Sequence, residues 1–449
     1  MLWQAAALQA ATTVTNISAG AFHSLFLMSD GSLWAMGCNS SGQLGDGTFN
    51  DTNRPEQIIS SNVVAIAGGY YHSLFLKSDG SLWAMGYDSS GQLGDGMTNT
   101  PGQGNGRIAI TNRPEQIVSS GVIAIAAGSV HSLFLKSNGS LWAMGYNGSG
   151  QLGDGTLTST NRPEQIVSNG VTAIAAGAFY SLFLKTNGSL WGMGANSYGQ
   201  LGDGTFNDVH QPEQIISNGV TVIAAEGEHS LFIKSDGSLW AMGLNYDGQL
   251  GNGTNGVYNY VKQPEQIVPT GVVAIATGDF YSKFLKTDGS LWSMGDNYFG
   301  ELGDGTFNST NRPEQIISSN VISIAGGFAY SLLLKSDGSL WAIGSNDEGQ
   351  LGDGFTSNSP VPEQIVPSPQ PMFTSDNISL KNDLQLSATC FFGGNYIILA
   401  GTNLTQPLSQ LTPVWTNPVT VRGTNNFTAT LTNVMNTGAA QQFYILQSQ

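Results

Sequence analysis

The chain has 449 residues, of which only 10% are charged and 59 are glycine, nearly twice the ~7% usual in globular proteins. Such a composition suits short strands joined by tight turns and argues against long helices. Acidic residues outnumber basic ones 31 to 15, for a formal net charge of −16, so nucleic acid is not expected as a partner. No apolar run approaches the ~18 residues of a membrane-spanning helix.

The chain ends and cysteines say little about the compartment. Met1–Ala11 is apolar but lacks the basic segment of a complete signal peptide, which leaves a trimmed signal peptide or a plain chain end as alternatives. Cys38 and Cys390 lie in different predicted domains, so no disulfide framework is indicated.

A run close to GSLWAMG recurs seven times along most of the chain. Its tryptophans are Trp34, Trp83, Trp142, Trp191, Trp240, Trp292 and Trp341. Their spacings of 49, 59, 49, 49, 52 and 49 residues are typical of β-propeller blades, each a small sheet that cannot bury its faces alone. The sequence therefore predicts an all-β, seven-bladed propeller over residues 14–366.

Each repeat predicts four short strands. In the second copy, Val63–Ala67, Ser73–Lys77 and Ser81–Met85 have strand length, and Ser78–Gly80 has the composition of a tight hairpin turn with a positive-φ glycine. The proline of the RPEQI run, such as Pro114, lacks an N–H donor and suits an outer edge strand. Whether the first and last repeats each build a whole blade or interlock at the ring closure stays open.

Alternation along the third strand predicts how neighbouring blades pack. Leu82 and Ala84 face one side and Trp83 and Met85 the other, and both sides are expected to be covered by adjacent blades. In the GQLGDG run that follows, Leu93 is expected to tuck under the blade.

These residues resemble the repeats of the regulator of chromosome condensation family, of bacterial type, from about Val14 to Val366. The family carries an alanine-glycine, a histidine-serine strand, a glycine-terminated aromatic strand and a GQLGxG turn. It commonly has tryptophan just before the strand-ending glycine, a place occupied in this chain by other apolar residues. They are Met36, Met85, Met144, Met193, Met242, Met294 and Ile343. The tryptophan stands two residues earlier, on the same face of the strand.

The resemblance implies function less strongly than fold. The founding member exchanges nucleotide on a small GTPase through an inserted wedge, and its basic arm docks on chromatin; neither feature is visible here. The plant UV-B photoreceptor uses a tryptophan-arginine run, where this chain has Ala21–Ser24 and Tyr70–Ser73. A secreted bacterial propeller that inhibits β-lactamases presents loops similar to Asp296–Gly300, which suggests a mode of action by analogy.

Three recurrent polar positions have structural explanations. One position alternates between histidine and tyrosine, as expected of a hydrogen-bonding core group and not of a metal ligand; it holds His23, His72, His131, Tyr180, His229, Tyr281 and Tyr330. An aspartate between two glycines, such as Asp95, or Asn252 in the fifth copy, suits a turn better than calcium. Glu56 and Gln57 recur in every blade, whereas an active site normally breaks symmetry. No cofactor, metal site or catalytic set is predicted.

Variable loops carry the candidate binding residues. Aromatic side chains follow the strand-ending glycines of several repeats, and homologous turns lie on one end of a propeller; these residues are Tyr87, Tyr146, Tyr198, Tyr246, Tyr298 and Phe299. They form either a binding rim or covers for their own turns. The insert Met97–Thr111 and the loop Thr254–Val261, with Tyr258 and Tyr260, are a second variable zone.

Beyond the propeller, residues 367–374 form a proline-rich linker and 375–449 a small β-sandwich-like module, after the N-terminal segment 1–13. The runs 395–400, 425–431 and 441–446 have strand composition. The module resembles immunoglobulin-like or fibronectin-like domains that end many secreted bacterial proteins.

The sequence as a whole favours a non-enzymatic scaffold, outside the cytoplasm or in the cell envelope, that binds a protein or another macromolecule through loops on one propeller face. A polysaccharide-acting enzyme with its site at the propeller mouth is the alternative, and guanine-nucleotide exchange is a third class.

Overall fold

The computed structural model describes residues 12–97 and 110–368 with their side chains, and six further strands between residues 372 and 448 by their backbone alone. These described residues contain strands and turns but no helix, so none of them forms a helix that could cross a membrane. The chain divides into two compact units, and residues 14–335 and 340–366 make up the larger one.

The larger unit is a seven-bladed propeller, as the repeat predicted. It contains seven four-stranded sheets, and in each one the four strands are antiparallel neighbours in chain order. Each blade is therefore built from one repeat.

The strands of the seven blades follow the apolar runs of the repeats. The first strands are β1 (Val14–Ala19), β5 (Val63–Gly68), β9 (Val122–Ala127), β13 (Val171–Ala176), β17 (Val220–Glu226), β21 (Val272–Thr277) and β25 (Val321–Gly326). The second strands are β2 (His23–Met28), β6 (His72–Lys77), β10 (His131–Lys136), β14 (Tyr180–Lys185), β18 (His229–Lys234), β22 (Tyr281–Lys286) and β26 (Tyr330–Lys335). The third strands are β3 (Leu33–Gly37), β7 (Leu82–Tyr87), β11 (Leu141–Gly145), β15 (Leu190–Gly194), β19 (Leu239–Leu244), β23 (Leu291–Gly295) and β27 (Leu340–Gly344). The fourth strands are β4 (Thr52–Ile59), β8 (Ile110–Val118), β12 (Thr160–Val167), β16 (Val209–Ile216), β20 (Tyr260–Val268), β24 (Thr310–Ile317) and β28 (Ser359–Val366).

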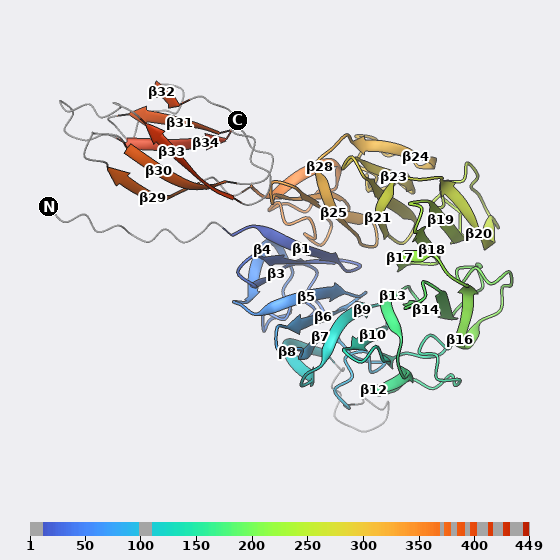
Figure 1. Cartoon of the computed structure of the whole chain (residues 1–449). Coiled ribbons are helices and arrows are strands. Elements are labelled where there is room, and N and C mark those ends of the chain that lie inside the picture. The colour runs from blue at the N-terminus through green and yellow to red at the C-terminus, as the bar shows by residue number, and fades with distance from the viewer. Residues whose placement is uncertain are drawn as a thin grey trace. The chain divides into compact units, whose positions relative to one another are not determined.

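The first strands surround the centre of the ring and contact one another from blade to blade (Figure 1). The fourth strands, which carry the RPEQI run, are the most exposed and form the circumference. The ring closes where β1 contacts β25 and β26. No strand is exchanged at this junction, which answers the question that the repeat pattern left open.

Apolar cores fill the spaces between blades, as the alternation predicted. Leu82 and Ala84 cluster with side chains of the third blade, whereas Met85 and Trp83 cluster with those of the first. Leu93 joins the first of these cores and is 1% exposed. Met85 Sδ lies so close to Gly45 of the GQLGDG turn that a Cβ there would collide with it, which explains why glycine stands at this place.

The turns obey the predicted chemistry. Gly80 has φ of 77° in the hairpin between the second and third strands. Asp46 accepts hydrogen bonds from the amide of Asn39 at 2.9 Å and from the backbone N–H of Thr48 at 2.8 Å. The recurrent aspartate therefore satisfies the donors of its own turn.

The alternating histidine and tyrosine residues form a closed belt of hydrogen bonds between blades. His23 Nε2 lies 2.7 Å from Ser73 Oγ of the next blade, and Ser73 in turn donates to the carbonyl of Gln43 at 2.7 Å. In the tyrosine version, the Tyr180 hydroxyl donates to the carbonyl of His229 at 2.5 Å. The seven inter-blade links are His23–Ser73, His72–Ser132, His131–Ser181, Tyr180–Ser230, His229–Ser282, Tyr281–Ser331 and Tyr330–Ser24. The predicted structural role of this position is confirmed.

Burial keeps the belt histidines neutral. Desolvation lowers the pKa of His72 to about 4 and that of His229 to about 3. Because Ser73 donates its proton to a carbonyl, the facing ring nitrogen of His23 must carry a proton and donate to the serine. These histidines are hydrogen-bond donors inside the ring.

The smaller unit contains six more strands: β29 (Met372–Ile378), β30 (Leu384–Cys390), β31 (Tyr396–Gly401), β32 (Thr412–Trp415), β33 (Asn425–Leu431) and β34 (Phe443–Ser448). They pair into two three-stranded sheets, β29-β30-β33 and β32-β31-β34. Three of them coincide with the strands expected from the sequence. The type of module stays a prediction.

Candidate functional site

The two ends of the blades differ in how much they vary. On one end lie the hairpins between second and third strands, which read Ser/Thr-Asp/Asn-Gly in every blade. On the same side of six blades a lysine ammonium covers a tryptophan ring, as Lys77 covers Trp83 at 4.1 Å. In five of these blades the tryptophan also stacks on a phenylalanine, as Trp83 does on Phe75. This end is therefore nearly uniform around the ring.

The other end, called the loop face below, carries two loops from each blade. Counted along each blade, the first loop joins the first and second strands, and the third loop joins the third and fourth strands. The second loop is the hairpin on the uniform end. The first and third loops are held together, because the residue after the strand-ending glycine donates to the first loop, as Tyr87 N does to Tyr71 O at 2.8 Å. The first loops comprise residues 20–22, 69–71, 128–130, 177–179, 227–228, 278–280 and 327–329.

The predicted aromatic rim lies on this face but does not form a continuous ring. Tyr87 packs against Tyr71, with ring centroids 6.4 Å apart, and Tyr146 packs against Phe179 at 6.0 Å. Tyr298 and its neighbour Phe299 contact each other at 4.9 Å. Another rim residue, Tyr198, contacts the second variable zone, in the loop Thr254–Val261.

Tyr198 meets that zone, since its ring lies 5.1 Å from Tyr260, which also contacts Tyr258. Tyr246, Tyr258 and Tyr298 are well exposed, at 48%, 81% and 73%. The rim residues thus fall into separate groups, and their role in binding stays a prediction. Most of the insert Met97–Thr111 lies outside the described residues.

The first loops bring together an aromatic cluster that the repeat pattern did not single out. Phe22 of the first blade lies 5.3 Å from Tyr70 of the second, 5.8 Å from Tyr71 and 5.5 Å from Phe328 of the seventh. Phe328 in turn lies 6.4 Å from Phe280 of the sixth blade. All five side chains, called the aromatic arc below, are partly exposed. They come from four consecutive blades.

Neighbouring first loops are also linked by backbone hydrogen bonds. Ala21 N donates to Gly69 O at 3.1 Å, Ala178 N to Gly227 O at 3.1 Å, and Asp279 N to Phe328 O at 3.3 Å. The first loops therefore form an inner ring on the loop face, around the centre of the propeller.

The fifth blade departs from its six counterparts in this inner ring. Three residues before the belt histidine or tyrosine, the other blades have glycine, and at Gly20 an added Cβ would lie 2.6 Å from the carbonyl oxygen of Gly69. The fifth blade has Glu226 there. The fifth blade has room for this side chain because β17 extends through Glu226, which pairs with His229. The positive-φ glycine stands one residue later, at Gly227, with φ of 50°.

Three carboxyl groups consequently lie close together at the inner ring: Glu226 at the end of β17, Glu228 in the first loop that follows it, and Asp279 of the sixth blade. The Asp279 side chain lies against the residue between the two glutamates, since a Cβ added at Gly227 would be 2.6 Å from Asp279 Oδ1. Desolvation and the nearby charge of Asp279 raise the pKa of Glu226 well above its usual range, and that of Glu228 to about 7. Burial raises the pKa of Asp279 itself to about 6. Within the described part of the chain, no lysine or arginine pairs with these three groups, called the acidic arc below.

Two models of known protein families match the chain. The RCC1-like domain model matches residues 3–268, and the regulator of chromosome condensation repeat model matches residues 288–334 and 337–375. The chain belongs to the RCC1-like family. Among curated protein sequences, none matches it.

Solved structures agree on the fold of this RCC1-like propeller. Human WBSCR16 is 22% identical, with a TM-score of 0.65 over 75% of this chain and 94% of its own. Yeast RCC1 (Prp20), solved bound to Kap60, is 22% identical, with a TM-score of 0.66 over 80% of this chain and 84% of its own. Another structure of Prp20p from Saccharomyces cerevisiae, described with its binding to Gsp1p and histones, is 21% identical. Identities this low show the fold alone.

The sixth blade of the RCC1-like ring holds a buried lysine. Lys283 replaces a leucine of the other copies and donates to Ser293 Oγ at 2.7 Å and to Leu302 O at 3.0 Å. Burial lowers its pKa to about 7, against the opposing influence of Glu301. A lysine beside a serine could activate a nucleophile. Because both side chains are 0% exposed, no substrate reaches them, and the group is structural.

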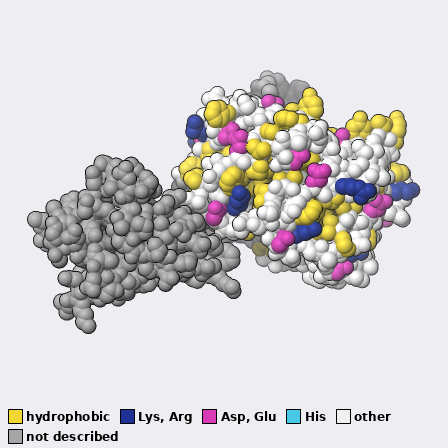
Figure 2. Space-filling view, turned by 90° about the horizontal axis from the view of Figure 1, so that it is seen from above, with side chains coloured by type: hydrophobic (Ala, Val, Ile, Leu, Met, Phe, Trp, Pro, Cys, Tyr) yellow, Lys and Arg dark blue, Asp and Glu magenta, His cyan; other side chains and the backbone are white. Residues whose placement is uncertain are grey.

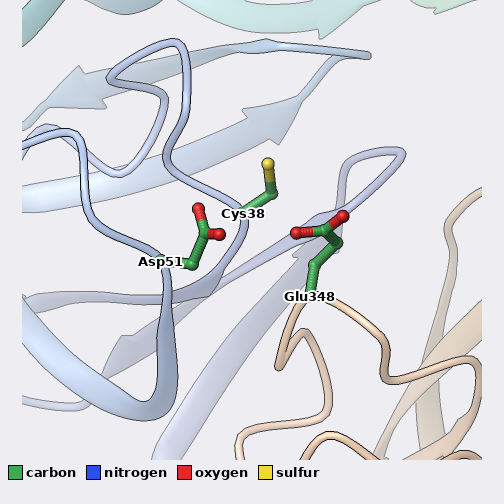
Figure 3. Close-up of side chains that lie close together, drawn as sticks. All are labelled: Cys38, Asp51 and Glu348. Carbon is green, nitrogen blue, oxygen red and sulfur yellow. The ribbon is translucent and has the colours of Figure 1, made fainter.

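One group of the RCC1-like propeller has donor atoms suited to a metal ion. Cys38 Sγ and carboxylate oxygens of Asp51 and Glu348 lie within 4.8 Å of one another, across the junction of the first and seventh blades (Figure 3). Asp51 already accepts the N–H of Asn39 at 2.6 Å, and the thiol lies 3.3 Å from Ser40 Oγ. Two of the three donors therefore already have protein partners, and the cluster supports no metal assignment.

Hollows on the circumference are lined by repeated residues. One of about 650 Å³ lies between the first two blades, beside Asp46, Glu56, Lys77 and Arg113. Equivalent acids and bases stand in most other blades, so this hollow does not single out one site. The side of the molecule in Figure 2 likewise shows acidic and basic side chains scattered among apolar and uncharged ones.

Sequence reasoning missed both departures of the fifth and sixth blades. The signal was available. AAEGEHS has Glu226 where the six other copies have glycine, and YSKFLK has Lys283 where the six other copies have leucine. Only the ring geometry shows that the first departure faces its neighbours on the loop face and that the second is sealed in a core.

Proposed function

We propose that this RCC1-like propeller is a binding scaffold that engages a protein or another macromolecule through its loop face, outside the cytoplasm. The observation that carries the proposal is the contrast between the two ends of the ring. The uniform end repeats its hairpins and Lys–Trp stacks. On the loop face, the first loops and the parts of the third loops outside the repeated GQLGDG turn differ from blade to blade. Partly exposed aromatic side chains such as Tyr70 and Phe328 are typical anchors of protein interfaces.

Affinity capture from native extracts, followed by pairwise binding with the captured partner, tests this proposal. Two loop-face variants are compared with the unaltered chain: Phe22, Tyr70 and Phe328 changed to alanine, and Tyr87, Tyr146, Tyr198, Tyr246 and Tyr298 changed to alanine. The control carries Lys185→Met and Lys286→Met on the uniform end, because the first blade has Met28 in that place.

Loss of the partner in either loop-face variant, with retention in the control, is the expected result and shows which group of aromatic residues binds. Equal capture by all four proteins would refute binding through the loop face. Comparing extracellular with intracellular extracts tests the proposed location in the same experiment.

A polysaccharide-acting enzyme is the second candidate, and the acidic arc is the observation that favours it. Glycoside cleavage uses two carboxyl groups, one held protonated near neutral pH, and the pKa of Glu228 is raised to about 7. Release of reducing ends from a panel of polysaccharides measures such activity. Activity abolished by Glu228→Gln or Asp279→Asn would support it, and no release by the unaltered chain would reject it.

A further inference from the structure

The inner ring of first loops is chemically divided. The acidic arc occupies the fifth and sixth blades, and the aromatic arc runs from the sixth blade through the seventh and first to the second. The two arcs meet at Asp279 and Phe280, which are consecutive in the chain. They are also linked through the seventh blade, because Asp279 N donates to Phe328 O at 3.3 Å and the Phe328 ring lies 6.3 Å from that of Tyr70.

The acidic arc is costly for the propeller itself. The Glu226 side chain stands where six other blades have glycine, lies partly exposed at the inner end of β17, and has no hydrogen-bond partner among the described residues. Glu228 accepts one hydrogen bond, from Gln200 of the fourth blade. Crowding three carboxyl groups without a basic partner destabilises a fold, so their presence in one blade pair points to a ligand and not to packing.

We infer that the inner ring binds a positively charged side chain of the partner protein, and that this side chain is an arginine. The inference rests on the proposed function and names the chemistry of the partner at that face. Carboxyl groups attract a cation, and aromatic faces bind one by cation–π contact, worth about 0.5–2 kcal/mol. A guanidinium is planar, weakly hydrated and able to bind a carboxylate in bidentate fashion while it stacks on a ring.

The acidic arc also predicts how binding depends on pH. With their raised pKa values, Glu228 and Asp279 are partly protonated near pH 6, and an arriving cation favours their ionised forms. The charge of Asp208 also raises the pKa of Glu228. The hydroxyls of Tyr70, Tyr180 and Tyr330 face the acidic arc, and burial together with its carboxylates raises the pKa values of these tyrosines. Binding is therefore expected to release protons and to strengthen by on the order of tenfold between pH 5.5 and pH 8.

Fluorescence anisotropy with the full chain tests the inference directly. The probe is a labelled Gly/Ser peptide whose only charged side chains are two arginines. The matched probe has citrulline in their place, which keeps the shape but removes the charge. The test variant is Glu226→Gln with Glu228→Gln and Asp279→Asn. The control removes the same charge from the circumference, by Glu56→Gln with Glu164→Gln and Glu314→Gln, all exposed.

The expected result is that the arginine probe binds the unaltered chain and the control about tenfold or more tighter than the citrulline probe, and that the test variant loses this difference. Equal loss in the control, or equal binding of the two probes, overturns the inference. So does calcium at about 1 mM abolishing arginine binding by occupying the acidic arc, since the site would then be a metal site. Thermal unfolding confirms that each variant is folded.

The captured partner separates the two proposals. If the aromatic variant loses the partner but the acid-to-amide variant retains it, the arginine inference fails and the loop-face function stands. If neither the acid-to-amide variant nor either of the two aromatic variants changes capture, the proposed function itself fails.

Discussion

The Tyr330 hydroxyl of the last blade donates a hydrogen bond, 2.5 Å long, to the backbone carbonyl of His23 in the first blade. This link and the 3.1 Å bond from Ser24 Oγ to the same hydroxyl join two blades that no chain segment connects directly. The ring is therefore closed by buried side-chain bonds and apolar packing instead of by a shared sheet.

Tyr330→Phe removes the donor and leaves the buried carbonyl of His23 without this partner. We expect the free energy of unfolding to fall by about 1–3 kcal/mol, measured by urea denaturation. Tyr180→Phe is the matched variant, because Tyr180 makes the same bond between two blades that the chain does connect. Tyr246→Phe, on the surface, should change stability by less than about 0.5 kcal/mol. A Tyr330→Phe chain as stable as the surface control contradicts this account of closure.

Asp88→Asn should stabilise the propeller in a pH-dependent way. The other blades have asparagine at this place, and Asn39 donates to the turn aspartate Asp46. Asp88 cannot donate when ionised, its Oδ2 has no hydrogen-bond partner, and burial with the charge of Asp95 raises its pKa to about 7. A raised pKa means that ionisation costs stability, a cost absent near pH 4 and complete above pH 7.

The gain from Asp88→Asn should therefore be about 1–3 kcal/mol at pH 8 and close to zero at pH 4, as measured by chemical denaturation at both pH values. Asp347→Asn, on an exposed side chain, is the control and should show little change at either pH. An equal gain at pH 4 and pH 8 would mean that ionisation of Asp88 is not the cause.

Alanine should destabilise the chain at Gly20 but not at Glu226, which stands at the equivalent place of the fifth blade. At Gly20 a Cβ would press against the Gly69 carbonyl, so Gly20→Ala is expected to cost about 1–3 kcal/mol. The fifth blade already accommodates a side chain, so Glu226→Ala should cost nothing, and should stabilise the chain at pH 8 because a desolvated acid is removed. Thermal unfolding of both variants measures the contrast, and similar losses in the two would show that the shifted glycine does not make room.

The buried lysine of the sixth blade should be replaceable only together with its partners. Lys283→Leu with Ser293→Ala and Glu301→Gln restores residues found in other blades, and is expected to be neutral or stabilising by about 1–4 kcal/mol. Ser293→Ala alone leaves the ammonium short of an acceptor and should cost about 1–3 kcal/mol. Urea denaturation of the single and triple variants tests this. A triple variant less stable than the unaltered chain would show that the buried charge contributes net stability.

Much of the fold could be predicted from the sequence, because each blade repeats the same local signals. The hairpin glycines, the two-sided packing of Leu82 and Trp83, and the hydrogen-bonding role of His72 all depend on neighbours within one repeat or the next. Because these signals recur in all seven repeats, the strands and turns of each blade could be predicted from the sequence.

The candidate site could not be predicted in the same way, since it depends on which loops meet around the ring. Phe22 and Phe328 belong to the first and the last blade of the chain, yet their rings lie 5.5 Å apart. Tyrosines after the strand-ending glycines share similar places in the sequence but point into separate groups. Which loops lie side by side depends on how the ring closes in space, and the spacing of residues along the chain does not show this.

Each blade is one uninterrupted stretch of chain, and this has a consequence for how such a protein diversifies. Duplication or loss of a repeat would add or remove a whole sheet with its own turns, leaving no half-sheet to be completed elsewhere. Individual modules can likewise diverge without a matching change in a distant segment. Glu226 in the fifth blade and Lys283 in the sixth are two such local departures, and the residues that make room for each lie in its own blade.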